Sequence, residues 1–186
     1  MASRWDEICH HNENILKKFM ELLDLKTGQS VLDVGSGTGV LLPYIFEAIG
    51  ETGQIYAVDY AEKMIDISRK KNIYKNIEFK VVDFYEMNPE KYKFDCIICY
   101  SMFPHVSDKE KAIKHFVSLL KNSGKLLICH SESRDIINKC HRESDETVND
   151  HVLPPAAEIS RIAESTGLKI IHAIDQEFYY VLSCKI

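Results

Sequence analysis

A glycine-rich turn between two short apolar runs constrains the fold of this chain more than any other feature. Residues 31–39 read Val-Leu-Asp-Val-Gly-Ser-Gly-Thr-Gly, and a second apolar run, 54–58, ends at Asp59. A strand, a glycine turn, a helix and a second strand that ends in a carboxylate are typical of a nucleotide-binding βαβ unit. The glycines let the backbone approach a ligand, and Asp59 is placed to accept hydrogen bonds from ribose hydroxyls. The alternative interpretation is a tight strand-to-helix turn that binds no ligand.

The spacing of the glycines selects among nucleotides. A dinucleotide fingerprint reads G-x-G-x-x-G, but Val40 stands where its third glycine belongs, and no Gly-Lys-Ser/Thr follows to make a P-loop. The pattern D-x-G-x-G-x-G, which begins at Asp33, resembles the first motif of the class I S-adenosylmethionine-dependent methyltransferases. The resemblance implies that Asp33, Gly35, Gly37 and Gly39 surround the methionine part of that cofactor.

Length and composition set limits on the fold and on the partners. With 186 residues, 45% of them hydrophobic, the chain fits one α/β domain. A net charge of -5 argues against a nucleic-acid substrate, and no apolar stretch approaches the length of a membrane span. We therefore expect a cytoplasmic protein with a small-molecule substrate; the oligomeric state is left open. Cys96 and Cys99 fall three apart in one predicted strand, so they point to opposite faces and cannot chelate one metal together.

Apolar runs alternate with helical patterns along the chain. The expected helices are 11–25, 38–49, 61–72, 108–120 with a C-cap at Asn122-Ser123-Gly124, and a last one from Pro154-Pro155 to residue 165. The expected strands are 30–34, 54–58, 77–82, 94–100, 125–130, 168–174 and 178–185. This succession resembles the class I methyltransferase fold, which implies a Rossmann-like, doubly wound α/β sheet of seven strands in the order 3-2-1-4-5-7-6. The sheet is mostly parallel with an antiparallel C-terminal strand. We expect a single domain, 1–186, with a helical cap at 1–27 and an insert at 131–153 over the substrate site.

The same resemblance assigns further cofactor contacts at the ends of the strands. Asp83 matches the position that binds the adenine amino group, and Phe84 the position beside the ring; a helix N-cap is the alternative for Asp83. The resemblance also implies that Tyr60 and Met64 lie near the adenosine; core packing is the alternative for both. The methionine end of the cofactor is assigned to Tyr100 and Ser101.

Histidines are the second unusual feature of the chain. The stretch 94–106 resembles the family pattern in which a strand beginning F-D is followed by a loop that ends His-Val, although Pro104 replaces the first of two family histidines. Six of the eight histidines are expected near one rim of the sheet. They are His10, His11, His105, His130, His141 and His151. Such imidazoles can bind a metal, act as general bases, contact an acceptor or simply lie in solvent.

From this set we predict catalytic roles for His105, His130 and His141, and a substrate contact for His11. Arg134 is a second candidate substrate contact, with a surface ion pair to Glu132 or Asp135 as its alternative. If 134–142 is helical, Asn138 and His141 share a face with Arg134. A metal is possible, but the spacing of these ligand types matches no zinc motif.

The sequence as a whole predicts an enzyme that transfers a methyl group from S-adenosylmethionine to a small molecule. Because the sulfonium is an activated donor, positioning can supply much of the rate, and no nucleophile motif is expected. Two alternatives remain open. One is a non-catalytic S-adenosylmethionine-binding or metal-sensing protein, and the other is a nicotinamide-dependent oxidoreductase.

Overall fold

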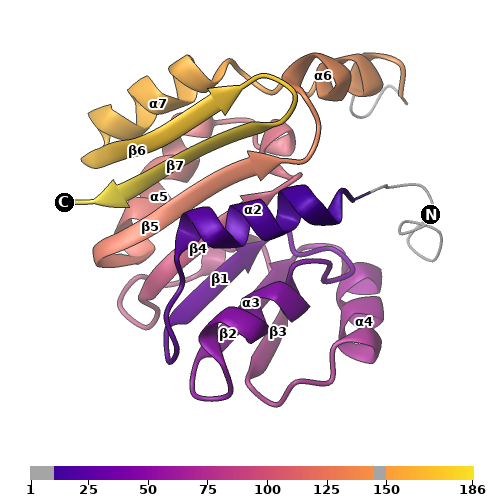
Figure 1. The fold of residues 1–186 in the computed structure, drawn as a ribbon, viewed down its shortest axis with the longest axis vertical. Helices are drawn as coiled ribbons and strands as arrows, with labels where there is room; N and C mark the ends of the chain where they lie inside the picture. Colours follow the sequence, from indigo (N-terminus) through magenta and orange to yellow (C-terminus); the bar gives the residue numbers. More distant parts are fainter. Residues whose placement is uncertain (1–10, 145–149) are drawn as a thin grey trace.

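The computed structural model describes residues 11–144 and 150–186 as a seven-stranded sheet with helices on both faces (Figure 1). The strand order is β3-β2-β1-β4-β5-β7-β6, as predicted. The strands are β1 Ser30–Val34, β2 Gln54–Asp59, β3 Ile77–Val81, β4 Phe94–Tyr100, β5 Leu120–His130, β6 Leu168–Asp175 and β7 Tyr179–Lys185. Strands β1 to β5 pair in parallel, whereas β7 runs antiparallel to both β5 and β6. The carboxyl ends of β1 to β5 therefore meet at one edge of the sheet, called here the carboxyl edge.

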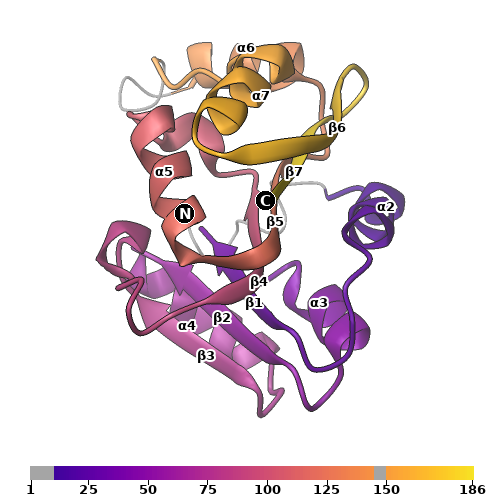
Figure 2. The ribbon, with the colours of Figure 1, turned by 90° about the vertical axis from the view of Figure 1, so that its left-hand side faces the viewer.

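The helices form a layer on each face. They are α2 Glu13–Leu23, α3 Leu42–Ile49, α4 Glu62–Lys71, α5 Lys109–Leu119, α6 Arg134–Arg142 and α7 Ala156–Ser165, with short 3-10 turns η2 Phe84–Glu86 and η3 Phe103–His105. Figure 2 shows α2 and α3 on one side of the sheet, and α5 and α7 on the other. The apolar core is accordingly split into one cluster under α2 and α3 and another under α5 and α7.

Alternation along β4 distributes its side chains between these two clusters. Ile98 and Tyr100 belong to the α2–α3 cluster, whereas Ile97 and Cys99 belong to the α5–α7 cluster. Cys96 lies in the α2–α3 cluster, so the prediction that Cys96 and Cys99 face opposite sides is confirmed. No helix among residues 11–144 and 150–186 is long and apolar enough to cross a bilayer.

Several expected boundaries are wrong, and for three of them the contacts show the physical reason. The helix after β1 begins at Leu42, not at residue 38, because residue 38 still belongs to the glycine turn. In that turn the Gly39 N–H donates to the Ser36 carbonyl at 2.9 Å. The first helix begins at Glu13, since the side chain of Asn12 caps it by accepting from the Asn14 amide at 3.1 Å. His11 therefore precedes the helix.

The third correction concerns the end of α5. The segment Asn122-Ser123-Gly124 is not a helix C-cap but lies within β5, which begins at Leu120. Leu120 is buried and pairs with Phe94 of β4, and the ladder shifts register between Phe94 and Cys96. Ser123, at φ 61°, lies in the irregular stretch that follows. Burial of Leu120 thus outweighs the turn propensity of the segment after it.

Candidate functional site

The glycine loop lies at the carboxyl edge and adopts left-handed backbone at all three glycines. A Cβ on Gly35 would lie 2.7 Å from Met102 Cβ, and one on Gly39 would lie 2.3 Å from Ser68 Oγ. These two glycines are therefore required by packing within the protein. A Cβ on Gly37, in contrast, would meet nothing within 4 Å. Gly37 thus borders open space, as expected of a glycine that lets a ligand approach.

Asp33, the penultimate residue of β1, is buried directly below this loop. Its Oδ2 atom has no hydrogen-bond partner among the described residues, and neither has the hydroxyl of Ser36. Burial first, and the charge of Asp59 second, raise the pKa of Asp33 to about 7. A buried carboxylate oxygen without a donor is costly, so this arrangement indicates a site that a cationic or hydrogen-bonding ligand completes.

Asp59 ends β2 and holds the loop from the other side. One carboxylate oxygen accepts from the Gly37 amide at 3.0 Å, and the other accepts from the Ala61 amide at 2.8 Å. The aspartate at the strand end therefore fixes the glycine loop and the start of α4. Tyr60, the next residue, is 83% exposed, which rules out core packing for its side chain; Met64 on α4 is half-buried.

Asp83 and Phe84 follow β3. Asp83 is exposed, and its side chain caps η2 by accepting from the Tyr85 amide at 3.0 Å, so the capping role is present. The ring of Phe84 packs 5.0 Å from that of Phe116 on α5. The adenine contacts assigned to this pair stay predictions.

At the end of β4 a buried tyrosine links three segments. The Tyr100 hydroxyl lies 2.8 Å from Nδ1 of His11 and 2.9 Å from Oγ of Ser131, the residue after β5. Ser101 has φ 54° and an exposed side chain, and its amide donates to Cys129 O at 2.9 Å. The segment before α2 is thus joined to the carboxyl edge beside the glycine loop.

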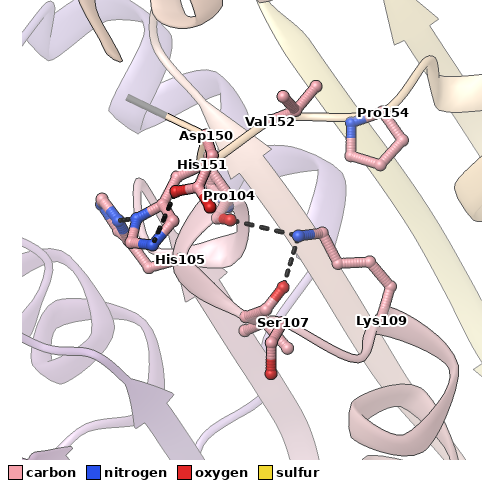
Figure 3. A pocket seen from close by; sticks show the side chains of 9 residues that line it. Pro104, His105, Ser107, Lys109, Asp150, His151, Val152 and Pro154 are labelled. Atoms are coloured by element: carbon pink, nitrogen blue, oxygen red, sulfur yellow. Dashed lines mark hydrogen bonds and ion pairs between the residues drawn. The ribbon is translucent and has the colours of Figure 1, made fainter. Parts of the chain in front are cut away.

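The other histidines gather on the α5–α7 side of the same edge. Nδ1 of His105 in η3 lies 2.8 Å from Nδ1 of His151 (Figure 3). Nδ1 of His141 on α6 donates to the His151 carbonyl at 2.8 Å. His105, although partly exposed, has its pKa lowered to about 4 by desolvation first and by His141 and His151 next. His130 ends β5 beneath them; its Nε2 has no partner among the described residues, and burial lowers its pKa to about 3.

The predicted rim of six histidines is therefore formed only in part. His11 lies with Tyr100 on the α2 side, four others gather near α6, and His10 lies outside the described residues. His115 and His172, the remaining two histidines, lie apart from these groups and contact the Phe84 carbonyl and the Tyr180 hydroxyl. Within 11–144 and 150–186, no three His, Cys, Asp or Glu side chains are arranged to hold a metal ion.

A cavity of about 420 Å³ opens beside the histidine group, between the loop after β4 and the residues before α7 (Figure 3). Its walls include His105, Val106, His151 and Pro154, and the side chain of Lys109 reaches across it. The Lys109 ammonium donates to the carbonyls of Pro104, at 3.1 Å, and Val106. Desolvation lowers the pKa of this lysine.

Arg134 pairs with a residue that sequence reasoning missed. Its Nε atom lies 2.9 Å from Oδ2 of Asp175 at the end of β6, and Asp135 is a more distant partner at 3.6 Å. The expected alternative with Glu132 is not formed among the ion pairs described. Asn138 was also undervalued: it makes two hydrogen bonds to the backbone of Leu153, at 2.8 and 3.0 Å. Its place on the same helical face as His141 was the available signal.

The fold defines a class of protein. The structure superposes on a SAM-dependent methyltransferase from Aquifex aeolicus with a TM-score of 0.77 at 22% identity, covering 100% of this chain and 99% of that one. It also superposes on the N-methyltransferase NodS from Bradyrhizobium japonicum in complex with S-adenosyl-L-homocysteine, with a TM-score of 0.73 at 14% identity, covering 93% and 87%. At these identities the likeness shows the fold alone, which is that of S-adenosylmethionine-dependent methyltransferases.

Sequence similarity then identifies the family. Residues 25–182 match the family described as a methyltransferase domain. Over 139 residues the chain is 31% identical to the ubiquinone/menaquinone biosynthesis C-methyltransferase UbiE of Klebsiella pneumoniae, an alignment that covers 73% of this chain and 55% of that protein. The chain thus spans about half the length of the curated relatives it matches. It belongs to the class I S-adenosylmethionine-dependent methyltransferases.

The residues at the carboxyl edge fit the cofactor of this family. The unpartnered Oδ2 of Asp33 suits the α-ammonium group of the cofactor's methionine part. The open space at Gly37 leaves room for the amino-acid end of the same methionine part. Asp59 stands at the tip of the neighbouring strand, where ribose hydroxyls are bound in such sheets.

Proposed function

We propose that this chain methylates a small molecule, with S-adenosylmethionine held along the carboxyl edge from Asp83 to Asp33. The observation that carries the proposal is the pairing of an unpartnered buried carboxylate, Asp33, with the open face of Gly37. When bound, the cofactor supplies a methyl group on a sulfonium, which is already activated for transfer. The chain's own residues then have to bind, orient and exclude water.

Each end of the cofactor has residues suited to it. Asp33 accepts from the ammonium group, and the backbone of Gly35 to Gly39 leaves space for the methionine part. Asp59 accepts from the ribose hydroxyls while it keeps the Gly37 amide in place. Asp83, Phe84, Tyr60 and Met64 border the adenine, and Tyr100 and Ser101 border the methionine end.

The acceptor side is proposed to lie between the segment before α2, the loop after β4 and residues 131–153. His11, joined to the Tyr100 hydroxyl, stands on one side of this region. His105, His130 and His141 stand on the other. The lowered pKa values of His105 and His130 keep both imidazoles neutral at pH 7, so each can accept a hydrogen bond from the acceptor, and they also make both imidazoles weak bases. Arg134 is held by Asp175, which leaves it a role in shaping the insert and, we propose, in contacting an anionic acceptor.

The relatives guide the choice of acceptor class. The name of the Klebsiella relative states C-methylation in ubiquinone and menaquinone biosynthesis, which makes small quinol-like aromatic compounds the first acceptors to try. The net charge of -5 supports a small molecule over a nucleic acid. The unpaired thiols of Cys96, Cys99 and Cys129 support the reducing cytoplasm as the compartment.

Calorimetry followed by transfer assays tests the proposal. The chain is titrated with S-adenosylhomocysteine and with NADH, and then incubated with methyl-labelled S-adenosylmethionine and a panel of phenols, quinols, amines and thiols. Binding of S-adenosylhomocysteine without NADH binding, followed by labelling of a small molecule, is the expected result. Cofactor binding without transfer to any acceptor would favour a non-catalytic binding protein, and binding of NADH alone would favour an oxidoreductase.

A further inference from the structure

Lys109 brings a positive charge to the wall of the cavity without a carboxylate beside it. Its ammonium donates to the carbonyl of Pro104 at 3.1 Å and to that of Val106 (Figure 3). It forms no ion pair within the described parts of the chain, and Glu158 of α7 acts on it only from beyond ion-pair distance. A half-buried cation whose direct partners are all neutral is stabilised when an anion binds next to it.

A second lysine shows why the position of Lys109 is unusual. Lys185 of β7 is also half-buried and also donates to two carbonyls, those of Val117 at 3.0 Å and Leu120 at 3.1 Å. These carbonyls lie at the carboxyl end of α5, where the helix dipole attracts cations. Lys109 is the first residue of the same helix, at the end where the dipole favours anions. The helix therefore compensates the charge of Lys185 but not that of Lys109.

The cavity sets the size and polarity of a ligand. Its volume of about 420 Å³ falls in the range of small-molecule sites. In Figure 3 the imidazoles of His105 and His151 lie at one end of the cavity, and the Lys109 side chain lies toward the other, below Val152 and Pro154. Val152 is 51% exposed, so the apolar part of a ligand can cover it. These walls suit a small molecule with an apolar body and one charged group.

Acidic side chains near the cavity indicate at which end an anion binds. Asp150 Oδ1 lies 3.8 Å from Nε2 of His151, so the histidine end already has a carboxylate. Asp108 caps α5 by accepting from the Lys111 amide at 2.8 Å, and it forms no ion pair with Lys109. Repulsion from Asp150 therefore favours the Lys109 end for a bound anion.

The number of donors on Lys109 favours one kind of anion. An ammonium group has three N–H donors, and two of them go to the carbonyls of Pro104 and Val106. The one that remains suits a carboxylate, which needs a single charge-assisted bond, better than a phosphate, which is held by several donors. Arg134 is a weaker candidate for the same ligand, since Asp175 already balances its charge at 2.9 Å.

We propose that this cavity binds the carboxylate of a small acidic molecule through the Lys109 ammonium, with the apolar body of that molecule against Val152 and Pro154. The inference rests on the proposed function and makes this molecule the methyl acceptor. The loop after β4 joins the two sites, because Met102 in that loop packs against Gly35 of the glycine loop. An acid held at Lys109 is therefore bound beside the loop that borders the methionine end of the cofactor.

The test is a titration of the full chain with benzoate and with its neutral isostere benzamide, followed by nitrogen-15 NMR of the backbone amides. We expect benzoate to bind at least about tenfold more tightly than benzamide, because only benzoate forms a charge-assisted hydrogen bond. The amide signals that shift should include those of Val106, Lys109 and Val152. Each titration is run with and without S-adenosylhomocysteine.

Three variants make the result specific. Lys109→Met keeps the length of the side chain without its charge, and it should weaken benzoate binding at least about tenfold while benzamide binding stays the same. Lys109→Arg should restore most of the benzoate affinity. The matched control Lys185→Met removes an ammonium with the same two-carbonyl pattern and should leave benzoate binding unchanged. A cooperative thermal transition shows that each variant is folded.

Several outcomes would overturn the acid site. They are absence of benzoate binding, equal affinity for benzoate and benzamide, shifts confined to amides away from the cavity, and unchanged benzoate affinity in Lys109→Met. The comparison of the two ligands uses the wild type, so it decides the matter even where Lys109→Met does not fold. Binding of benzoate without binding of S-adenosylhomocysteine would support the acid site and contradict the proposed function. Binding of S-adenosylhomocysteine without benzoate would do the reverse.

Discussion

Replacing Asp33 by asparagine should make the protein without cofactor more stable at alkaline pH and, at the same time, weaken cofactor binding. Asp33 is buried with Oδ2 unpartnered, and its pKa is raised from 3.8 to about 7. Because the folded state holds the proton more tightly than the unfolded chain, the stabilising effect is complete below pH 3.8 and is lost as the pH rises to about 7. A shift of about 3 units corresponds to about 4 kcal/mol at 1.36 kcal/mol per unit.

The assay is the free energy of unfolding in urea, measured for wild type and Asp33→Asn at several pH values between 4 and 8. The carboxamide carries no charge, so the difference between the two proteins should move in favour of the variant by about 4 kcal/mol across this range. Taking the difference cancels the contributions of His105 and His130, which both proteins share. The control Asp135→Asn removes an exposed carboxylate on α6 and should not reproduce this pH dependence.

Binding should change in the opposite sense. Loss of a charge-assisted hydrogen bond to the ammonium group should weaken S-adenosylhomocysteine binding by about tenfold or more. Wild type should also bind more weakly at pH 6 than at pH 8, because Asp33 has to lose its proton to accept from the ligand. A stability difference that is constant from pH 4 to pH 8, or an unchanged affinity in the variant, would refute the reasoning about Asp33.

Three further predictions follow from other contacts. Gly37→Ala should lower the free energy of unfolding by about 1–2 kcal/mol, because the backbone there is left-handed, and should abolish measurable cofactor binding. Gly39→Ala should lower it by about 2–5 kcal/mol, because the new Cβ would also collide with Ser68. Thermal unfolding with and without S-adenosylhomocysteine separates the two effects. Asn138→Ala leaves the buried amide and carbonyl of Leu153 unpaired and should cost about 2–5 kcal/mol of the free energy of unfolding in urea; a loss below about 0.5 kcal/mol would contradict this role of Asn138. The pKa of His130 is lowered from 6.5 to about 3, so below its unfolded pKa the unfolded chain gains a proton that the folded protein does not. The wild type should therefore lose about 2 kcal/mol of unfolding free energy between pH 7.5 and pH 5, and His130→Gln should not lose this amount. Equal losses in the two proteins would contradict the buried, neutral state of His130.

Much of the fold could be predicted because its signals are local. The apolar runs, the glycine turn and the aspartate at the end of β2 locate the parallel strands, and family resemblance supplies the strand order. Errors arose where distant contacts decide the outcome. Leu120 joins β5 because it pairs with Phe94, which no local pattern around Asn122-Ser123-Gly124 reveals.

The site shows the same division. The need for Gly35 and Gly39 could be predicted from the motif. The motif does not reveal that a Cβ at these positions would collide with Met102 and Ser68. The partner of Arg134 lies 41 residues away in β6, at Asp175. The histidines could be placed at one edge from the ends of the strands. Their division between the α2 and α6 sides depends on the path of the chain before α2 and of residues 150–154, which no local pattern reveals.

A crystal structure of the full chain with S-adenosylhomocysteine tests the central claim most directly. We expect the ammonium group within hydrogen-bond distance of Asp33 Oδ2, the methionine backbone against Gly37, and the ribose hydroxyls on Asp59. A ligand bound elsewhere, or bound at this edge with Asp33 Oδ2 still unpartnered, would contradict the account.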